Sequence, residues 1–304
     1  MVPVVHQLAP GLLTSSHPSV AWIRTTRAKY LVFDADATRP VCVVEFGDAE
    51  RLRRVHAILL ELHRRCPGDV PRPLASAPWV AGTAVHIQEG LPGVPWFRLA
   101  DSLPSADAWR SLLDRAVAVM QRLDAAIIAV PAWVGTVDVR EALAEQVRVS
   151  RRHGALAPLL LLQVEKCGDR LRSLAPLPAV WQHGDFSLNN LMVSPDSIAV
   201  IDFDDFGLTQ VPLHDAFGLA LSFQLSQDGQ CPIGAAECVE RCLAATTSFG
   251  RLDDGTVHGL LLHHLLWRIN QCHGHPTRER LRAWLTAAVQ RVVWAPGNGL
   301  SAIA

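Results

Sequence analysis

Short runs of β-branched and aromatic residues alternate with polar positions near the start of the chain. Residues 28–35 and 41–46 have this pattern and are separated by a turn-forming segment, which predicts two strands joined by a turn. Residues 49–65 place leucine and valine at helical spacing with charges on the opposite face, which predicts an amphipathic helix. Prolines and a glycine follow it, and residues 83–88 predict a further strand.

The pattern changes after residues 89–95, a segment rich in glycine and proline. Helical spacing dominates from there on. We expect helices at residues 106–126, 139–152, 213–227, 235–249, 257–272 and 277–293. Residues 191–193 and 198–201 predict a short hairpin between them. The chain is therefore expected to have an α+β fold with a small β-rich domain at residues 1–90, a linker, and a larger helical domain at residues 91–304.

Composition narrows the classes of protein that fit. The chain has 304 residues, 49% of them apolar and 19% charged, which is typical of a globular protein. The formal net charge of −1 argues against a nucleic-acid-binding protein, and no apolar run is long enough to span a membrane. Seven cysteines without a paired motif, and no pattern of a signal peptide, favour a reducing compartment. We expect a cytoplasmic protein without a nucleic-acid or membrane partner; composition leaves the oligomeric state open.

Oxygen-bearing side chains gather in the segment of residues 183–207. Asn190 precedes the first strand of the predicted hairpin, and Asp202 and Asp204 follow its second strand. A hairpin whose strands start and finish at one end brings Asn190 and Asp202 together, and Asp185 lies five residues before Asn190. Hard oxygen ligands of this kind suit Mg²⁺, and a further carboxylate can orient a hydroxyl group and accept its proton.

The motifs HGDFSLNN and IDFDD at this spacing resemble those of the aminoglycoside phosphotransferase and choline kinase superfamily. That superfamily has a protein-kinase-like fold with two lobes. The resemblance implies an ATP- and Mg²⁺-dependent phosphotransferase with an alcohol group as acceptor. It implies that Asp185 is the catalytic base, that His183 braces its loop, and that Asp215 anchors that loop from below. Asn190 and Asp202 are implied as Mg²⁺ ligands, and Asp204 is a further candidate ligand.

The resemblance also implies where the nucleotide binds. ATP, or another nucleoside triphosphate, is expected in a cleft whose hinge is the segment of residues 89–95, so Glu89 and Leu91 are candidate nucleotide contacts. Residues 15–19 are a candidate phosphate loop, although they contain no glycine.

One position departs from the pattern of kinase-like proteins. Their third strand carries a lysine that contacts the phosphates of ATP, and the corresponding residue here is Glu45. Glu45 is expected to form a reversed ion pair with a cation on the following helix: Arg53, Arg54 or His56. Alternatively, Lys29 or Arg27 on the preceding strand contacts the phosphates, or the protein is a pseudokinase-type binding module. A strand register shifted by one residue instead turns Glu45 to solvent.

The sequence leaves the acceptor open. An aminoglycoside site is expected to present several carboxylates from the last helices to ammonium groups, and the tail of this chain is comparatively poor in them: Glu237, Glu240, Asp253, Asp254 and Glu279. We expect a hydroxyl acceptor that is a small molecule, such as an antibiotic or a natural-product-like metabolite, with a role in antibiotic resistance or biosynthesis. A neutral or zwitterionic natural product and a choline-like metabolite are both open. The alternative acceptor is a Ser/Thr side chain of a peptide or protein, for example a precursor peptide.

Overall fold

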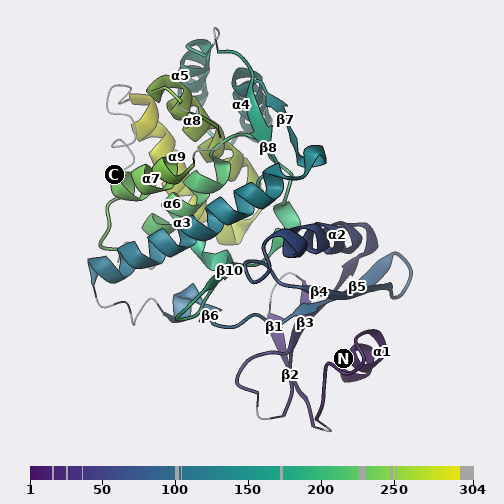
Figure 1. Ribbon diagram of the computed structural model, residues 1–304. Helices are drawn as coiled ribbons and strands as arrows, with labels where there is room; N and C mark the ends of the chain where they lie inside the picture. Colours follow the sequence, from purple (N-terminus) through teal and green to yellow (C-terminus); the bar gives the residue numbers. More distant parts are fainter. Residues whose placement is uncertain are drawn as a thin grey trace. The chain divides into compact units, whose positions relative to one another are not determined.

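The computed structural model describes most of the chain (Figure 1). The described residues are 1–15, 17–24, 27–35, 37–99, 103, 105–171, 174–225, 231–246, 249–250 and 252–294. The chain divides into two compact units: unit 1 consists of Met1–Leu103 and Asn189–Asp205, and unit 2 of Pro104–Leu188 and Phe206–Ala304. The boundary expected after residue 90 thus lies inside unit 1, which also contains the hairpin segment.

Unit 1 is built on a five-stranded antiparallel sheet in the order β1-β2-β3-β5-β4. The strands are β1 (Ser19–Arg24), β2 (Ala28–Phe33), β3 (Cys42–Asp48), β4 (Pro73–Pro78) and β5 (Thr83–Glu89). Helix α1 (Val2–Leu8) packs on one face, where its Val4 and Val5 meet Val44 and Ile87 in a buried apolar cluster. Helix α2 (Ala49–Arg65) packs against β3, β4 and β5 (Figure 1).

The two faces of this sheet differ in polarity. Side chains alternate between the faces of a strand, and the register puts Lys29 opposite Glu45 and Glu45 opposite His86. These three residues form a polar row across β2, β3 and β5, on the face that meets α2. Asp48 caps the start of α2, because its carboxylate accepts the Arg51 backbone N–H at 2.8 Å. The sheet face under α2 is therefore the one with candidate chemistry.

The predicted hairpin forms and joins unit 1. β9 (Leu191–Val193) and β10 (Ile198–Val200) pair antiparallel, and β9 also pairs with β6 (Val94–Pro95). Gly93, just before β6, has a φ of 93°, and a Cβ there would collide with the backbone of Val193. A residue with a side chain is excluded at this close approach. The linker predicted from composition is thus held to the hairpin by strand pairing.

In its described residues, unit 2 is helical apart from one two-stranded ribbon, β7 (Val134–Val137) with β8 (Leu177–Val180). Its helices are α3 (Ala106–Ile128), α4 (Val139–His153), α5 (Pro158–Asp169), α6 (His214–Leu225), α7 (Ala235–Ala245), α8 (Asp254–Gln271) and α9 (Glu279–Trp294). Residues on all sides of α8 are buried, and it packs against α4, α5, α6 and α9. Burial on all sides makes α8 an interior helix, although it carries three histidines. The end predicted for α6 at residue 227 lies outside the described residues.

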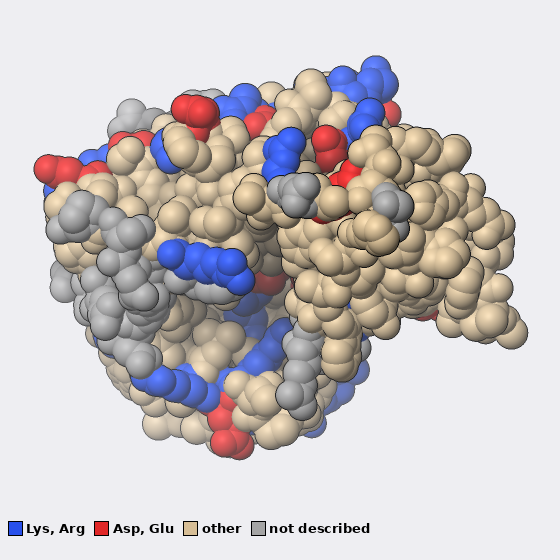
Figure 2. Space-filling model, turned by 90° about the horizontal axis from the view of Figure 1, so that it is seen from below, with Lys and Arg blue, Asp and Glu red and all other residues tan. Residues whose placement is uncertain are grey.

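The sequence pattern missed elements whose signals are weak. β4 has proline at both ends, which is tolerated because it is an edge strand. α5 starts at Pro158, and its run of leucines lacks a polar face, so it has no clear period. α1, β7 and β8 are short. No helix within the described ranges is long and apolar enough to cross a membrane. In the face seen in Figure 2, acidic and basic side chains lie interspersed among uncharged ones.

Candidate functional site

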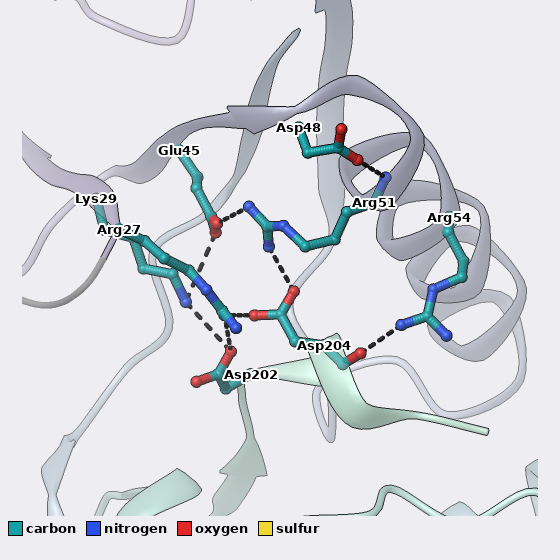
Figure 3. Close-up of polar contacts among 8 residues, drawn as sticks. All are labelled: Arg27, Lys29, Glu45, Asp48, Arg51, Arg54, Asp202 and Asp204. Atoms are coloured by element: carbon teal, nitrogen blue, oxygen red, sulfur yellow. Dashed lines mark hydrogen bonds and ion pairs between the residues drawn. The ribbon is translucent and has the colours of Figure 1, made fainter. Parts of the chain in front are cut away.

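Charged side chains of unit 1 gather between β2, β3, α2 and the segment after β10 (Figure 3). We call this group the charged cluster; it consists of Arg27, Lys29, Glu45, Arg51, Arg54, Asp202 and Asp204. Lys29 is central, because its Nζ lies 3.2 Å from Asp202 Oδ1 and 3.6 Å from Glu45 Oε2. An ammonium group from β2 thus contacts the first aspartate of the IDFDD motif.

Glu45 is buried, with 8% of its surface exposed, so the alternative in which it points to solvent is wrong. Its Oε1 accepts from Nη2 of Arg51, whose Nη1 also donates to Asp204. The reversed ion pair therefore exists, but its cation on α2 is Arg51. The three cations expected from the sequence to pair with Glu45 make other contacts. Arg53 donates to the Ala49 carbonyl, Arg54 donates to the Asp204 carbonyl, and His56 packs edge-on against His86.

Asp202 and Asp204 have different surroundings. The Asp204 side chain is 9% exposed, and its two carboxylate oxygens meet Arg27 and Arg51. The Asp202 side chain is 37% exposed, and its Oδ1 lies 3.3 Å from Arg27 Nη1. Asp202 also has a φ of 67°, in the left-handed region that few residues other than glycine adopt, although asparagine and aspartate tolerate it better than most. Such strain is typical of functional positions, so Asp202 is the more accessible and more constrained of the two carboxylates.

The hairpin brings the backbones of the two predicted metal ligands together, as expected. The Asn190 carbonyl accepts the N–H of Ile201, the residue before Asp202, at 2.9 Å. Among the described residues, no three or more His, Cys, Asp or Glu side chains form a group that could hold a metal ion. An amide with an accessible carboxylate nonetheless fits Mg²⁺, which uses one or two protein carboxylates and completes its shell with phosphates and water.

The predicted hinge residues lie at the end of β5. The Glu89 N–H donates to the Arg72 carbonyl at 2.8 Å, and its carboxylate lies 3.7 Å from Arg72 Nε. Leu91 is 7% exposed, and within the described ranges its backbone makes no hydrogen bond to another residue. In the candidate phosphate loop, the Ser15 N–H donates to Asp34, and Ser16 lies outside the described residues.

The HGD segment lies in unit 2, where a buried aspartate holds it. Asp215 accepts the N–H of His183 at 2.6 Å and that of Gly184 at 3.0 Å, which confirms the predicted anchor. Its complete burial raises the pKa of Asp215. The Asp185 N–H lies 3.3 Å from Nδ1 of the buried His183, and His214 Nε2 lies 3.3 Å from the Gly184 carbonyl oxygen. The backbone that presents Asp185 is therefore fixed from below.

Sequence reasoning missed a contact of Asp185 itself. Nη1 of Arg268, in the last turn of α8, donates to Asp185 Oδ1 at 2.6 Å. Arg268 is the only lysine or arginine of α8, most of whose residues are buried, a signal that could have marked it as functional. Arg51 was missed for another reason, since it is one of several arginines on α2 and nothing in the pattern separates it from Arg53 or Arg54.

A small antiparallel sheet with a helix over its charged face, an acidic segment after a hairpin and an anchored HGD loop define a kinase-like phosphotransferase. The model of the family described as "Phosphotransferase enzyme family" matches residues 19–247. The chain belongs to this family, as its motifs predicted. The α+β, protein-kinase-like fold class is confirmed.

Solved structures of this fold are similar at low identity. A GDP complex of an aminoglycoside 2'-phosphotransferase-IIIa mutant has a TM-score of 0.64 and 13% identity, covering 98% of both chains. A choline/ethanolamine kinase family protein from Mesorhizobium loti has a TM-score of 0.62 and 16% identity, and the match covers 99% of this chain and 97% of that one. A glucosamine kinase in complex with glucosamine, ADP and inorganic phosphate has a TM-score of 0.56 and 15% identity, and the match covers 92% of this chain and 80% of that one. No curated protein matches the chain.

Proposed function

We propose that this phosphotransferase moves the γ-phosphoryl group of ATP, with Mg²⁺, to a hydroxyl group of a small molecule. The contact between Lys29 and Asp202 carries the proposal. It places the ammonium group of Lys29 beside the predicted Mg²⁺ ligand, where it can bind phosphate in place of the lysine that Glu45 replaces on the third strand. The similar structures with ADP, GDP and glucosamine support a nucleotide and a hydroxyl-bearing acceptor.

We assign the nucleotide to unit 1. Leu91, at the end of the sheet, offers backbone groups without internal hydrogen bonds, and Glu89 lies beside it. The ammonium group of Lys29 contacts the phosphates, and the carboxylate of Glu45 orients that ammonium group through their ion pair. Asn190 and Asp202 hold Mg²⁺, whose charge offsets that of the triphosphate; a ligand role for Asp204 stays a prediction, since arginines surround its carboxylate.

We assign the base to unit 2. Asp185 accepts the proton of the acceptor hydroxyl. The hydroxyl oxygen bonds to the γ-phosphorus at the same time, and the bond from that phosphorus to ADP breaks. His183 and Asp215 keep the loop in place through the hydrogen bonds described above. An ordered loop matters because proton transfer requires the base within hydrogen-bond reach of the hydroxyl.

The test measures binding and turnover separately. Titration of the purified protein with ATP or GTP, with and without Mg²⁺, gives the nucleotide affinity, and ADP release with a panel of hydroxyl compounds gives turnover. Asp185→Asn is expected to abolish turnover while nucleotide affinity stays within a factor of about two, and Asp196→Asn, in the exposed turn of the hairpin, is the control. Transfer to a Ser/Thr peptide but to no small molecule would replace the acceptor class, and nucleotide binding without any transfer would indicate a binding module.

A further inference from the structure

The candidate base has a cation beside it. Nη1 of Arg268 lies 2.6 Å from Asp185 Oδ1, and the two side chains are 24% and 35% exposed. The side chain of an arginine has five N–H donors, and within the described part of the chain this is the one hydrogen bond that the Arg268 side chain makes. The side chain is still partly accessible, so its other donors are available to a ligand that reaches Asp185.

Two buried imidazoles lie within electrostatic range of Arg268. They are His214 and His264, which lie under the HGD loop with ring centroids 4.4 Å apart. Burial lowers the pKa of both imidazoles well below their usual value, so they are neutral near pH 7. Arg268, in contrast, is a positive charge directly beside Asp185.

Some of the carboxylates that could bind an ammonium-bearing acceptor make other contacts in unit 2. Glu237 binds Arg110 at 2.7 Å and Arg241 at 3.2 Å, and Asp114 binds Arg241 at 2.7 Å. Asp253 caps α8 by accepting from the backbone and hydroxyl of Thr256. Two of the five carboxylates that the sequence offers for this purpose, Glu237 and Asp253, are thus occupied by arginine or by helix capping.

We propose that Arg268 forms the subsite for an anionic group, a carboxylate or a phosphate ester, on the molecule that is phosphorylated. This inference rests on the proposed function, since it takes Asp185 as the base. The acceptor hydroxyl and the guanidinium contact the same carboxylate, so the anionic group lies close to the reacting hydroxyl. A guanidinium binds carboxylate and phosphate through paired hydrogen bonds, whereas it repels an ammonium group. The subsite therefore selects hydroxy acids or phosphorylated alcohols over amino sugars.

The experiment compares acceptors in matched triplets that share a carbon skeleton and differ in charge. Glucuronate, glucose and glucosamine form one triplet, and glycolate, glycolamide and ethanolamine another; glycerol phosphate against glycerol is the separate phosphate arm. With Mg²⁺ and ATP, the wild type is expected to favour an anionic member in kcat/KM. Arg268→Met is expected to reduce the preference for anionic over neutral acceptors by about 10- to 100-fold. Arg268→Lys keeps part of it, because a lysine lacks the paired geometry.

Two comparisons separate binding from mere support of the loop. If Arg268 only held Asp185 in place, Arg268→Met would lower kcat/KM for neutral and anionic acceptors equally, which would overturn the proposal. Faster transfer to the ammonium members would also overturn it, and so would transfer to neutral members alone. Arg140→Met, an exposed arginine on α4, is the matched control and keeps the wild-type preference. If the wild type transfers phosphate to no acceptor of any charge and does not bind nucleotide, the proposed function itself is overturned.

Discussion

Lys29 on β2 and Glu45 on β3 are direct cross-strand neighbours, and the Lys29 Nζ lies 3.6 Å from Glu45 Oε2. The third strand of this sheet thus supplies the carboxylate, the second strand supplies the ammonium group, and Arg51 on α2 holds the carboxylate from the other side. The usual order of lysine and glutamate is shifted by one element. The cation still contacts the acidic motif, because Lys29 reaches Asp202.

Removal of the Lys29 ammonium is expected to weaken nucleotide binding. Lys29→Met should raise the dissociation constant for Mg²⁺-ATP by about 10- to 100-fold, the range of a charge-assisted hydrogen bond. Calorimetric titration measures it. Lys166, on α5, is the only other lysine of the chain, so Lys166→Met is the matched control. Equal affinities for the two variants would contradict the assignment of Lys29.

The same pair of lysines allows a direct chemical readout. An acyl-phosphate derivative of ATP transfers its acyl group to a nearby amine, forming an amide and releasing ATP and a proton. Mass spectrometry is expected to find Lys29 labelled, and excess ATP should protect it. Lys166 serves as the internal reference for labelling that does not depend on nucleotide binding. Labelling of Lys29 that excess ATP leaves unchanged would show that the amine is away from the phosphates.

Loss of Arg51 is expected to destabilise unit 1. Arg51→Met leaves the carboxylates of Glu45 and Asp204, with side chains 11% and 9% exposed, without their shared partner. Removal of one partner from buried polar groups should lower the free energy of unfolding by about 1–3 kcal/mol, measured by urea denaturation. Arg53→Met on the same helix is the control, since Arg53 donates only to a backbone carbonyl. Adding Glu45→Gln to Arg51→Met should recover part of the loss.

The two properties of Asp202, its carboxylate and its left-handed backbone, can be separated by substitution. Asp202→Asn keeps a residue that tolerates positive φ, so we expect wild-type thermal stability together with loss of the Mg²⁺ dependence of nucleotide binding. Asp202→Val should lose the same dependence and also about 1–2 kcal/mol of stability, because a β-branched residue is strained at a φ of 67°. Thermal melts and titrations at two Mg²⁺ concentrations measure both. An Mg²⁺ dependence retained in both variants would exclude Asp202 as a ligand.

Asp124 is expected to make stability fall as the pH rises. It lies buried on α3, where burial and the charge of Asp215 raise its pKa from 3.8 to about 8. Between these two pH values, Asp124 holds a proton in the folded protein that it has lost in the unfolded chain. The contribution of Asp124 to stability is therefore fully present below the pKa of the unfolded chain and is lost as the pH rises toward the pKa in the folded protein. Asp124→Asn should therefore raise the melting temperature near pH 8 and have a smaller effect near pH 5.

The control for Asp124 is an exposed aspartate outside unit 2. Asp196→Asn, in the hairpin turn, should leave the difference between melting temperatures at the two pH values unchanged. The same difference in wild type and Asp124→Asn would show that Asp124 is ionised in the folded protein. The measurement requires only thermal melts, because it concerns stability and not turnover.

Much of the fold and of the candidate site follows from the sequence alone. Helix α2 and most helices of unit 2 follow from their apolar period, and the hairpin of β9 and β10 follows from two short apolar runs around a turn. Spacing along the chain was sufficient to place Asn190 beside the segment of Asp202, because a hairpin is a local structure. The family was likewise recognisable from the HGD and IDFDD motifs, since both are contiguous in sequence.

Tertiary structure decided which charges meet. Arg51 is one of several arginines on its helix, and only the packing of α2 on the sheet selects it as the partner of Glu45. Arg268 and Asp185 are far apart in the chain, and only the position of α8 brings them to 2.6 Å. Periodicity records which face of an element is buried, but a long-range ion pair depends on the packing of elements and on side-chain rotamers. Neither of these leaves a pattern in a single sequence.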